Sequence, residues 1–266
     1  TFKENYEYGK LVSKTSYEYY ENGQLYLTKN HKTKTTSSGT SYLVLDGITS
    51  DWREDGTKMM EETWKDGTKI GYVHYLHYPS GQKEAEINHK GVSNNLDGTF
   101  TTWYENGQKH SEYYYKDDKR DGKYSTWYKS GQIKEEGNFK DDKEEGKQTF
   151  WYENGQIKQK GNFKDGKKHQ NFTLWHENGQ KEKELNFKDD ILVRQTNYHY
   201  YENSQMHKEL NFKDKKKDGK QTHWHENGQI ELETNYKDGK LDGKWTYWYQ
   251  NGQKAAEANY KYGKHD

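Results

Sequence analysis

One sequence motif recurs along almost the whole chain, and its period constrains the fold more than any other feature. A typical copy, WYENGQIKQKGNFKDGK, spans residues 151–167. When the glycine of each Asn-Gly-Gln stretch is taken as position 0, the chain divides into ten units, most of them 24 residues apart. The ten centres are Gly23, Gly56, Gly81, Gly107, Gly131, Gly155, Gly179, Ser204, Gly228 and Gly252. Self-similarity at such a period indicates a repeat protein in which each unit is one supersecondary structure.

The residue types within each unit indicate β-structure. Trp stands at position −4 in seven units, Tyr predominates at −3, an aromatic residue or His stands at +8, and Lys stands at +9 in all ten. Asn-Gly between two aromatic stretches of strand length predicts a hairpin with a two-residue type I′ turn. No 3.6-residue stripe persists, which argues against helices. The sequence therefore predicts an all-β fold, an elongated antiparallel meander of about ten tandem 24-residue β-hairpin repeats with roughly 20 strands.

Alternation along the strands predicts which positions share a face of the sheet. With a two-residue loop, one face takes Tyr at −3, the residue at +2 and the aromatic residue at +8, and we expect this face to form the core. The other face takes Trp at −4, Thr at −6 and Glu at +5. We expect this second face to meet a ligand.

Composition excludes several classes of protein. The mean hydropathy of −1.58 lies in the range of disordered chains, but 25 tyrosines, 9 tryptophans and a net charge of zero favour a folded chain packed through aromatic side chains. The balanced charge and the scarcity of arginine predict no nucleic-acid partner and disfavour membrane lipid. There is no cysteine, so disulfides and thiolate metal sites are excluded. No apolar stretch is long enough to span a membrane.

The stretches YYENGQL, WYENGQI and YKDGKLDGKWTYWYQNGQ resemble the variant MORN repeat, which occurs in tandem in bacterial proteins and in the YwqK-like antitoxin family. The resemblance implies successive β-hairpins in an elongated array. It also implies a mostly non-enzymatic role in binding proteins or lipids, and it carries over no catalytic residues.

The chain is expected to form one continuous repeat domain with two zones. Residues 1–97 hold degenerate repeats, and residues 98–266 hold regular variant MORN repeats. The first spacing of 33 residues includes an insertion, which predicts an extra hairpin around residues 33–46. It contains the strongest apolar β-stretch of the chain, from Tyr42 to Leu45. The insertion is interpreted either as a tolerated elongation or as a finger that docks a partner.

Candidate metal and catalytic residues have simpler explanations as members of the repeat. His176, His199, His223 and His225 occupy positions that hold Tyr, Thr or Phe in other units, so structural substitution is favoured over zinc binding. Acidic clusters such as KDDKRDG are interleaved with Lys, which favours solvated turns over calcium sites. Ten similar units offer no unique catalytic constellation. We therefore expect neither an enzyme nor a cofactor or metal.

The sequence thus predicts a non-enzymatic repeat protein that mediates protein–protein interaction, at the bacterial cell surface or as an antitoxin or immunity factor. The alternative is a module that binds cell-wall or host glycans. The missing initiator Met and the absence of Cys favour an extracellular location. The predicted partner-binding residues are the tryptophan row and the apolar stretch of the insertion, although packing of the tryptophans on neighbouring lysine stems remains an open alternative. They are Trp103, Trp127, Trp151, Trp175, Trp224, Trp248, Tyr42, Leu43, Val44 and Leu45.

Overall fold

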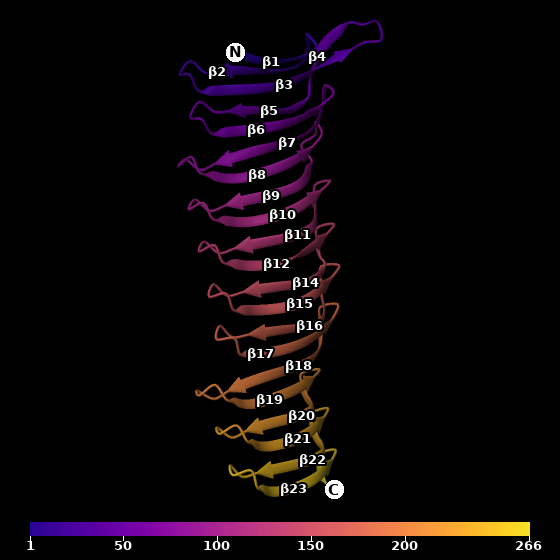
Figure 1. Ribbon diagram of the computed structural model, residues 1–266. Helices are drawn as coiled ribbons and strands as arrows, with labels where there is room; N and C mark the ends of the chain where they lie inside the picture. Colours follow the sequence, from indigo (N-terminus) through magenta and orange to yellow (C-terminus); the bar gives the residue numbers. More distant parts are fainter. The chain divides into compact units, whose positions relative to one another are not determined.

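The computed structural model describes residues 1–266 and consists of strands and turns without a helix. Its 24 strands form one open antiparallel sheet (Figure 1). Strands pair in chain order, except that β5 pairs with β3 and β14 pairs with β12. This confirms the predicted all-β meander. Ten hairpins account for most strands, and the additional ones are β1, the finger strand β4, and the two-residue strands β13 and β24.

The chain divides into two compact units. The first comprises Thr1–Ile133 and Phe139–Asp142, and the second comprises Lys134–Asn138 and Lys143–Asp266. The strands that begin in the first unit are β1 (Phe2–Glu7), β2 (Lys10–Tyr19), β3 (Leu25–Thr35), β4 (Ser41–Leu45), β5 (Gly47–Trp52), β6 (Lys58–Lys65), β7 (Thr68–His77), β8 (Lys83–Lys90), β9 (Leu96–Trp103), β10 (Lys109–Lys116), β11 (Lys119–Trp127) and β12 (Ile133–Lys140). Those of the second are β13 (Lys143–Glu144), β14 (Gly146–Trp151), β15 (Ile157–Lys164), β16 (Lys167–Trp175), β17 (Lys181–Lys188), β18 (Ile191–Tyr200), β19 (Met206–Lys213), β20 (Lys216–Trp224), β21 (Ile230–Lys237), β22 (Lys240–Trp248), β23 (Lys254–Lys261) and β24 (Lys264–His265).

The Asn-Gly loops have three residues, so the predicted two-residue type I′ turn was wrong at this end of the hairpins. In β14–β15 the Tyr152 N–H donates to the Gln156 carbonyl at 2.8 Å, and the Gly155 N–H donates to the Tyr152 carbonyl at 3.0 Å. Gly155 has φ of 85°, whereas Asn154 is not among the residues with positive φ. This is a type I turn followed by a left-handed glycine. The Asn154 Oδ1 accepts a hydrogen bond from the Gln156 N–H at 2.9 Å, which stabilises the turn.

The two-residue turns with two positive φ angles lie at the opposite ends of the strands, in the Lys-Asp-Gly-Lys stretches. Asp165 and Gly166 have φ of 51° and 78°, and the flanking Lys164 and Lys167 are paired. Both angles are those of a type I′ turn. Within each unit, Figure 1 shows the two kinds of turn at opposite ends of the strands.

A β-bulge beside each Asn-Gly loop compensates for the extra loop residue. In β14–β15, Trp151 pairs with Ile157 but Phe150 pairs with Gln159, so Lys158 is the additional residue. From Phe150 outward the register is therefore the one that a two-residue loop would give. As predicted, Thr at −6 lies opposite the residue at +5.

The bulge also corrects one part of the face prediction. The residue at +2 lies opposite Trp at −4, as Ile157 lies opposite Trp151, so these two side chains share a face. The prediction that +2 shares the face of Tyr at −3 and the aromatic residue at +8 was wrong. We call the side with positions −6, −4, +2 and +5 the tryptophan face, and the side with −7, −5, +4, +6 and +8 the phenylalanine face.

The main packing layer of the second unit lies on the phenylalanine face. Phe172, at position −7, is only 1% exposed, and its ring contacts those of Phe163 and Phe187 edge to face at 5.3 Å each. A Cβ atom at Gly161 would lie 2.1 Å from the Phe172 ring. The glycine at +6 therefore leaves room for the phenylalanine of the next hairpin.

Each hairpin is also bonded to the next through the residues that recur in the motif. The Tyr hydroxyl at −3 donates to the carbonyl of the Trp at −4 in the following hairpin, as in Tyr152 to Trp175 at 2.8 Å. The Asn side chain at −1 donates to a carbonyl of the following loop, as in Asn154 to Glu177 at 2.9 Å. These bonds explain why Tyr and Asn recur in the motif. Each hairpin supplies hydrogen bonds to the next hairpin, as in other repeat proteins.

Candidate interaction surface

The structure places the six predicted tryptophans at equivalent points on the tryptophan face. Each ends the first strand of its hairpin and is half-buried. Trp103 and Trp127 lie in the first unit, and Trp151, Trp175, Trp224 and Trp248 lie in the second. The indoles are therefore less enclosed than Phe172, and part of each remains available to a partner.

Lysine side chains lie over two of the indoles in the first unit, and one of these lysines also pairs with a glutamate. The Lys83 Nζ lies 4.9 Å from the centre of the Trp103 ring, and the Lys109 Nζ lies 5.4 Å from that of Trp127. Such cation–π contacts at exposed sites contribute about 0.5–1 kcal/mol. Lys83 also pairs with Glu86 at 2.9 Å. Because surface ion pairs of this kind contribute little, these charges can exchange partners on binding.

Between the indoles, the floor of the tryptophan face is polar. The threonines at −6 are buried there: Thr101, Thr149, Thr222 and Thr246. In the hairpin centred on Ser204, Tyr198 replaces threonine, and its hydroxyl donates to Glu184 at 3.0 Å. The hydrogen bond from Lys181, assisted by that from Tyr198, lowers the pKa of Glu184 against the effect of its burial. The glutamate is thus held as a carboxylate.

The backbone beneath the tryptophans is held without the indoles. The carbonyls of Trp103, Trp175 and Trp224 each accept a hydrogen bond from a tyrosine hydroxyl of the preceding hairpin. Removing an indole leaves this bond and the phenylalanine-face packing in place. The sequence allowed either packing or binding for the tryptophans, and the half-buried indoles have features of both.

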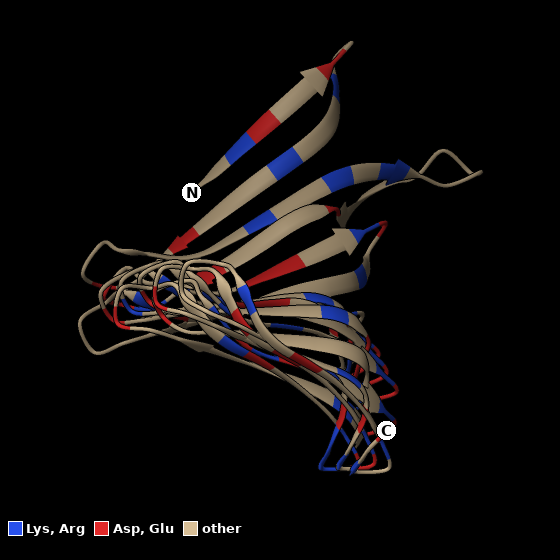
Figure 2. Cartoon of the chain, turned by 90° about the horizontal axis from the view of Figure 1, so that it is seen from below, with Lys and Arg blue, Asp and Glu red and all other residues tan.

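The four predicted residues of the insertion lie together in β4, which forms a finger with the end of β3. Pairing runs from His31 with Leu45 to Thr35 with Ser41. Tyr42 and Leu43 are 49% and 38% exposed, whereas Val44 and Leu45 are half-buried. Figure 2 shows that the finger tip carries no charged residue. A cleft of about 610 Å³ runs between the finger and the start of β2, and it is lined in part by Leu11, Thr33 and Tyr42.

The histidines take the places of other repeat residues. His225 stands at −3, and its Nε2 lies 2.9 Å from the Trp248 carbonyl. In several other hairpins a tyrosine hydroxyl donates to the equivalent carbonyl, as Tyr201 does to Trp224. Structural substitution explains this histidine. The structure contains no group of three or more His, Cys, Asp or Glu residues arranged to hold a metal ion, and none of its elements is a helix long and apolar enough to cross a membrane.

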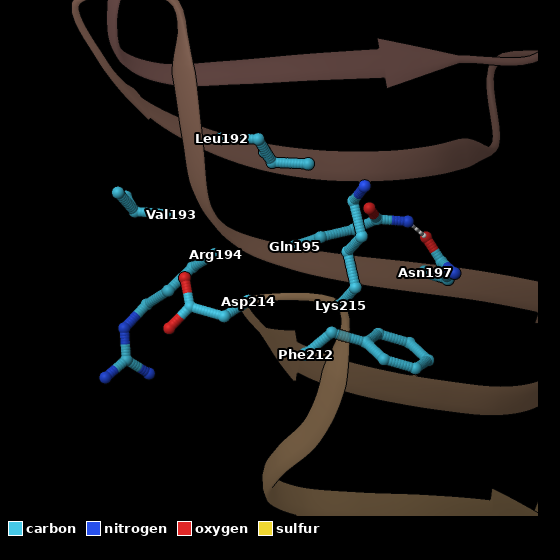
Figure 3. Close-up of a pocket in the computed structure, with 8 residues that line it drawn as sticks. All are labelled: Leu192, Val193, Arg194, Gln195, Asn197, Phe212, Asp214 and Lys215. Carbon is cyan, nitrogen blue, oxygen red and sulfur yellow. Dashed lines mark hydrogen bonds between the residues drawn. The ribbon is translucent and has the colours of Figure 1, made fainter. Parts of the chain in front are cut away.

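One site was missed by sequence reasoning: a cavity of about 240 Å³ on the phenylalanine face of hairpin β18–β19 (Figure 3). This hairpin departs from the repeat at several positions, with Ser204 in place of the central glycine, Tyr200 in place of Trp, and Asn197 at −7. These departures were the available signal. Their joint effect on packing was not apparent without the neighbouring strands.

The fold and its repeated surface define a tandem β-hairpin repeat protein. Six segments match the family model described as the MORN repeat variant: residues 96–117, 120–141, 144–165, 171–189, 217–238 and 241–262. The chain thus contains six variant MORN repeats, which cover just under half of it and confirm that part of the resemblance. The gap between the fourth and fifth matches contains hairpin β18–β19.

Other comparisons give little further information. No curated protein matches the chain. Among solved structures, one described as TcdB2-TccC3-TEV is 10% identical with a TM-score of 0.24, and the alignment covers 98% of this chain but 18% of that one. A Bacteroides fragilis protein of unknown function is 12% identical with a TM-score of 0.13, and the alignment covers 76% of this chain and 92% of that one. At these scores neither similarity bears on function.

Proposed function

We propose that this chain is a non-enzymatic repeat protein whose tryptophan face binds a protein partner. The observation that carries the proposal is the half-buried indole that recurs at the same position of six hairpins, with a lysine over the rings of Trp103 and Trp127. Trp is among the residues that dominate binding energy at protein interfaces. The bonds that join the hairpins run through tyrosine hydroxyls, asparagine amides and backbone carbonyls, so the indoles are available for a second role.

The repeated surface suits a partner that is itself long or repeated. Apolar indoles alternate with charges of both signs, which matches the mixture of apolar contacts and polar rim found at protein interfaces. Several weak contacts on one scaffold add avidity when the partner engages them together. From the resemblance to the variant MORN repeat, we propose that the chain acts either at the bacterial cell surface or as an antitoxin or immunity factor.

Binding of glycans is the second candidate function. Indole rings next to threonine, asparagine and glutamate offer both an apolar platform and polar groups, and sugars can use both. The two candidates differ in the partner that the same surface would retain, so one set of variants tests both.

The test uses the double variant Trp175→Ala/Trp224→Ala. Its control is Leu174→Ala, a half-buried residue next to Trp175 on the phenylalanine face. Proteins cross-linked to the wild-type chain are identified by mass spectrometry, and a glycan array is probed in parallel. We expect the melting temperature of the double variant to stay within a few degrees of wild type. The double variant should lose most of the captured protein, whereas the control should retain the captured protein.

Two outcomes would change this proposal. If the double variant melts early but binds normally when folded, the tryptophans serve packing, and the finger residues Tyr42–Leu45 become the candidate surface. If the array retains the wild type and not the double variant, while protein capture is unaffected, the partner is a glycan.

A further inference from the structure

The cavity in hairpin β18–β19 occupies a place that a buried side chain fills in three other hairpins of the second unit. At position −7 the side chains of Gln148, Phe172 and Gln221 are 0%, 1% and 1% exposed. Asn197 holds this position in β18 and is only half-buried. Its Oδ1 accepts a hydrogen bond from the Gln195 Nε2, so its short amide is turned toward its own strand. The space that the Phe172 ring occupies in the preceding hairpin is therefore open.

The walls of the cavity are suited to an aromatic ring. Leu192 lies on one side and Phe212 on the other (Figure 3), and Val193 also belongs to the lining. Phe212 stands at +8, the position from which Phe163 and Phe187 contact Phe172 edge to face. The volume of about 240 Å³ exceeds that of an apolar cavity known to bind benzene, about 150 Å³.

A lysine extends over the open side of the cavity. Lys215 reaches across it from the β19–β20 turn, while Arg194 lies at the rim beside Asp214 (Figure 3). Arg194 is also 3.9 Å from Asp218, but Lys215 makes no ion pair. The positive charge of Lys215 is therefore free to meet an anion.

The charge of Lys215, and not its backbone, sets this turn apart. Lys215 has φ of 64°, and the equivalent residues of other turns are glycine, as at Gly166 and Gly239, or aspartate with a similar φ, as at Asp190 with 67°. Lysine at this position therefore adds a cation next to the open space of the cavity.

We infer that the cavity between β18 and β19 binds an aromatic ring that carries a carboxylate. The ring would occupy the space that Phe172 fills in the preceding hairpin, against Phe212 and Leu192, and the carboxylate would pair with Lys215. The ligand can be a free aryl acid or the C-terminal phenylalanine of a peptide, because both present the same groups. This site is separate from the tryptophan face and does not depend on the proposed function.

The test is calorimetric titration of the full chain with phenylacetate and with the peptide Gly-Gly-Phe carrying a free carboxylate. We expect saturable binding of at least one of them. Binding of phenylacetate identifies free aryl acids as sufficient, whereas binding of the peptide alone identifies a partner's C-terminus. Failure of both to bind would overturn the inference.

Two variants locate the site. Asn197→Phe introduces the phenylalanine that Phe172 provides at this position in the preceding hairpin, so it should raise the melting temperature and abolish binding. Lys215→Gly introduces the glycine found at this position in turns such as Asp165–Gly166, so the variant should keep the fold. Its affinity for the carboxylate probe should fall at least tenfold. Undiminished binding by both variants would place the ligand elsewhere and refute the site. If Asn197→Phe does not fold, Phe212→Leu replaces it and should also weaken binding at least tenfold, and undiminished binding there would refute the site equally.

Discussion

Gln148 and Gln221 stand at the same repeat position and are both buried, but only one of them has partners. The Gln221 amide donates to the Asn211 carbonyl at 2.8 Å and accepts from the Asn211 N–H at 3.0 Å. The Gln148 amide has no hydrogen-bond partner. A buried amide without hydrogen-bond partners is destabilising. Removing a buried amide that has partners leaves those partner atoms without a hydrogen bond.

This difference predicts opposite effects of the same substitution. Gln148→Met, which keeps the length of the side chain and removes the unpaired amide, should raise the free energy of unfolding by about 1–2 kcal/mol. Gln221→Met should lower it by about 1–3 kcal/mol, because the Asn211 backbone is left unpaired. Urea denaturation of the two variants measures both. Changes of the same sign would show that position, and not pairing, decides the effect.

His223 predicts a pH dependence of stability. Burial, with smaller contributions from Lys208, His207 and Lys217, lowers its pKa, and Glu231 opposes them. The unfolded chain has an ordinary histidine pKa of about 6.5, so it binds the proton first as the pH falls below that value. The stability of the folded chain should therefore decline from pH 6.5 downward, with no contribution from His223 at higher pH.

His223→Leu should reduce this decline, since Leu174 fills the same position in another hairpin. Melting temperatures at pH 7, 6 and 5 compare the variant with wild type. The exposed His176, changed to Gln, is the control and should follow the wild-type profile. Parallel curves for His223→Leu and wild type would exclude this histidine as the source.

At the scale of the hairpin, the tyrosine hydroxyl is the main side-chain link between one element and the next. Tyr201 donates to the Trp224 carbonyl at 2.7 Å, whereas Tyr249 belongs to the last Asn-Gly hairpin of the chain and has no following hairpin to bond. Tyr201→Phe should therefore lower the free energy of unfolding by about 1 kcal/mol. Tyr249→Phe should leave it within about 0.5 kcal/mol of wild type. Thermal unfolding measures both variants. An equal loss of stability in the two would mean that the hydrogen bond from Tyr201 to the Trp224 carbonyl does not stabilise the array.

The hairpins themselves were predictable, but their loops were not. The period, the aromatic stretches and the glycines determine where strands begin and end, and the structure confirms the array. Asn-Gly is compatible with both a type I′ turn and a type I turn with a left-handed glycine. The structure has the second, and the bulge at Lys158 then restores the expected register. Because a longer loop and a bulge cancel, Thr at −6 and the residue at +5 were placed correctly while +2 was not.

The candidate surfaces show the same limit. Period and alternation alone predicted that the tryptophans stand at equivalent positions of their hairpins, and each of them ends the first strand of its hairpin. The cavity beside Phe212 depends on what neighbouring strands leave unfilled, and Asn197 alone does not reveal it. A periodic sequence therefore predicts repeated features better than the consequences of one irregular unit.

At the scale of the whole molecule, stability should be the sum of hairpins and their nearest-neighbour contacts. Successive hairpins carry the same bonds at the same positions. One complete 24-residue repeat can therefore be removed without shifting the register of the remaining hairpins. Deleting residues 160–183 joins Gln159 at +4 to Glu184 at +5, and the motif continues unbroken. Deleting residues 160–182 leaves one residue too many within a strand. The side chains beyond it would then point to the opposite faces.

Thermal unfolding of these two deletions, followed by circular dichroism, is the most direct measurement. The 24-residue deletion should retain the β-spectrum and a cooperative transition, with a melting temperature only a few degrees below that of wild type. The 23-residue deletion should melt at a clearly lower temperature, because Phe187 moves off the phenylalanine face. Loss of folded structure in the 24-residue deletion, or equal melting of the two deletions, would contradict an array of interchangeable hairpins.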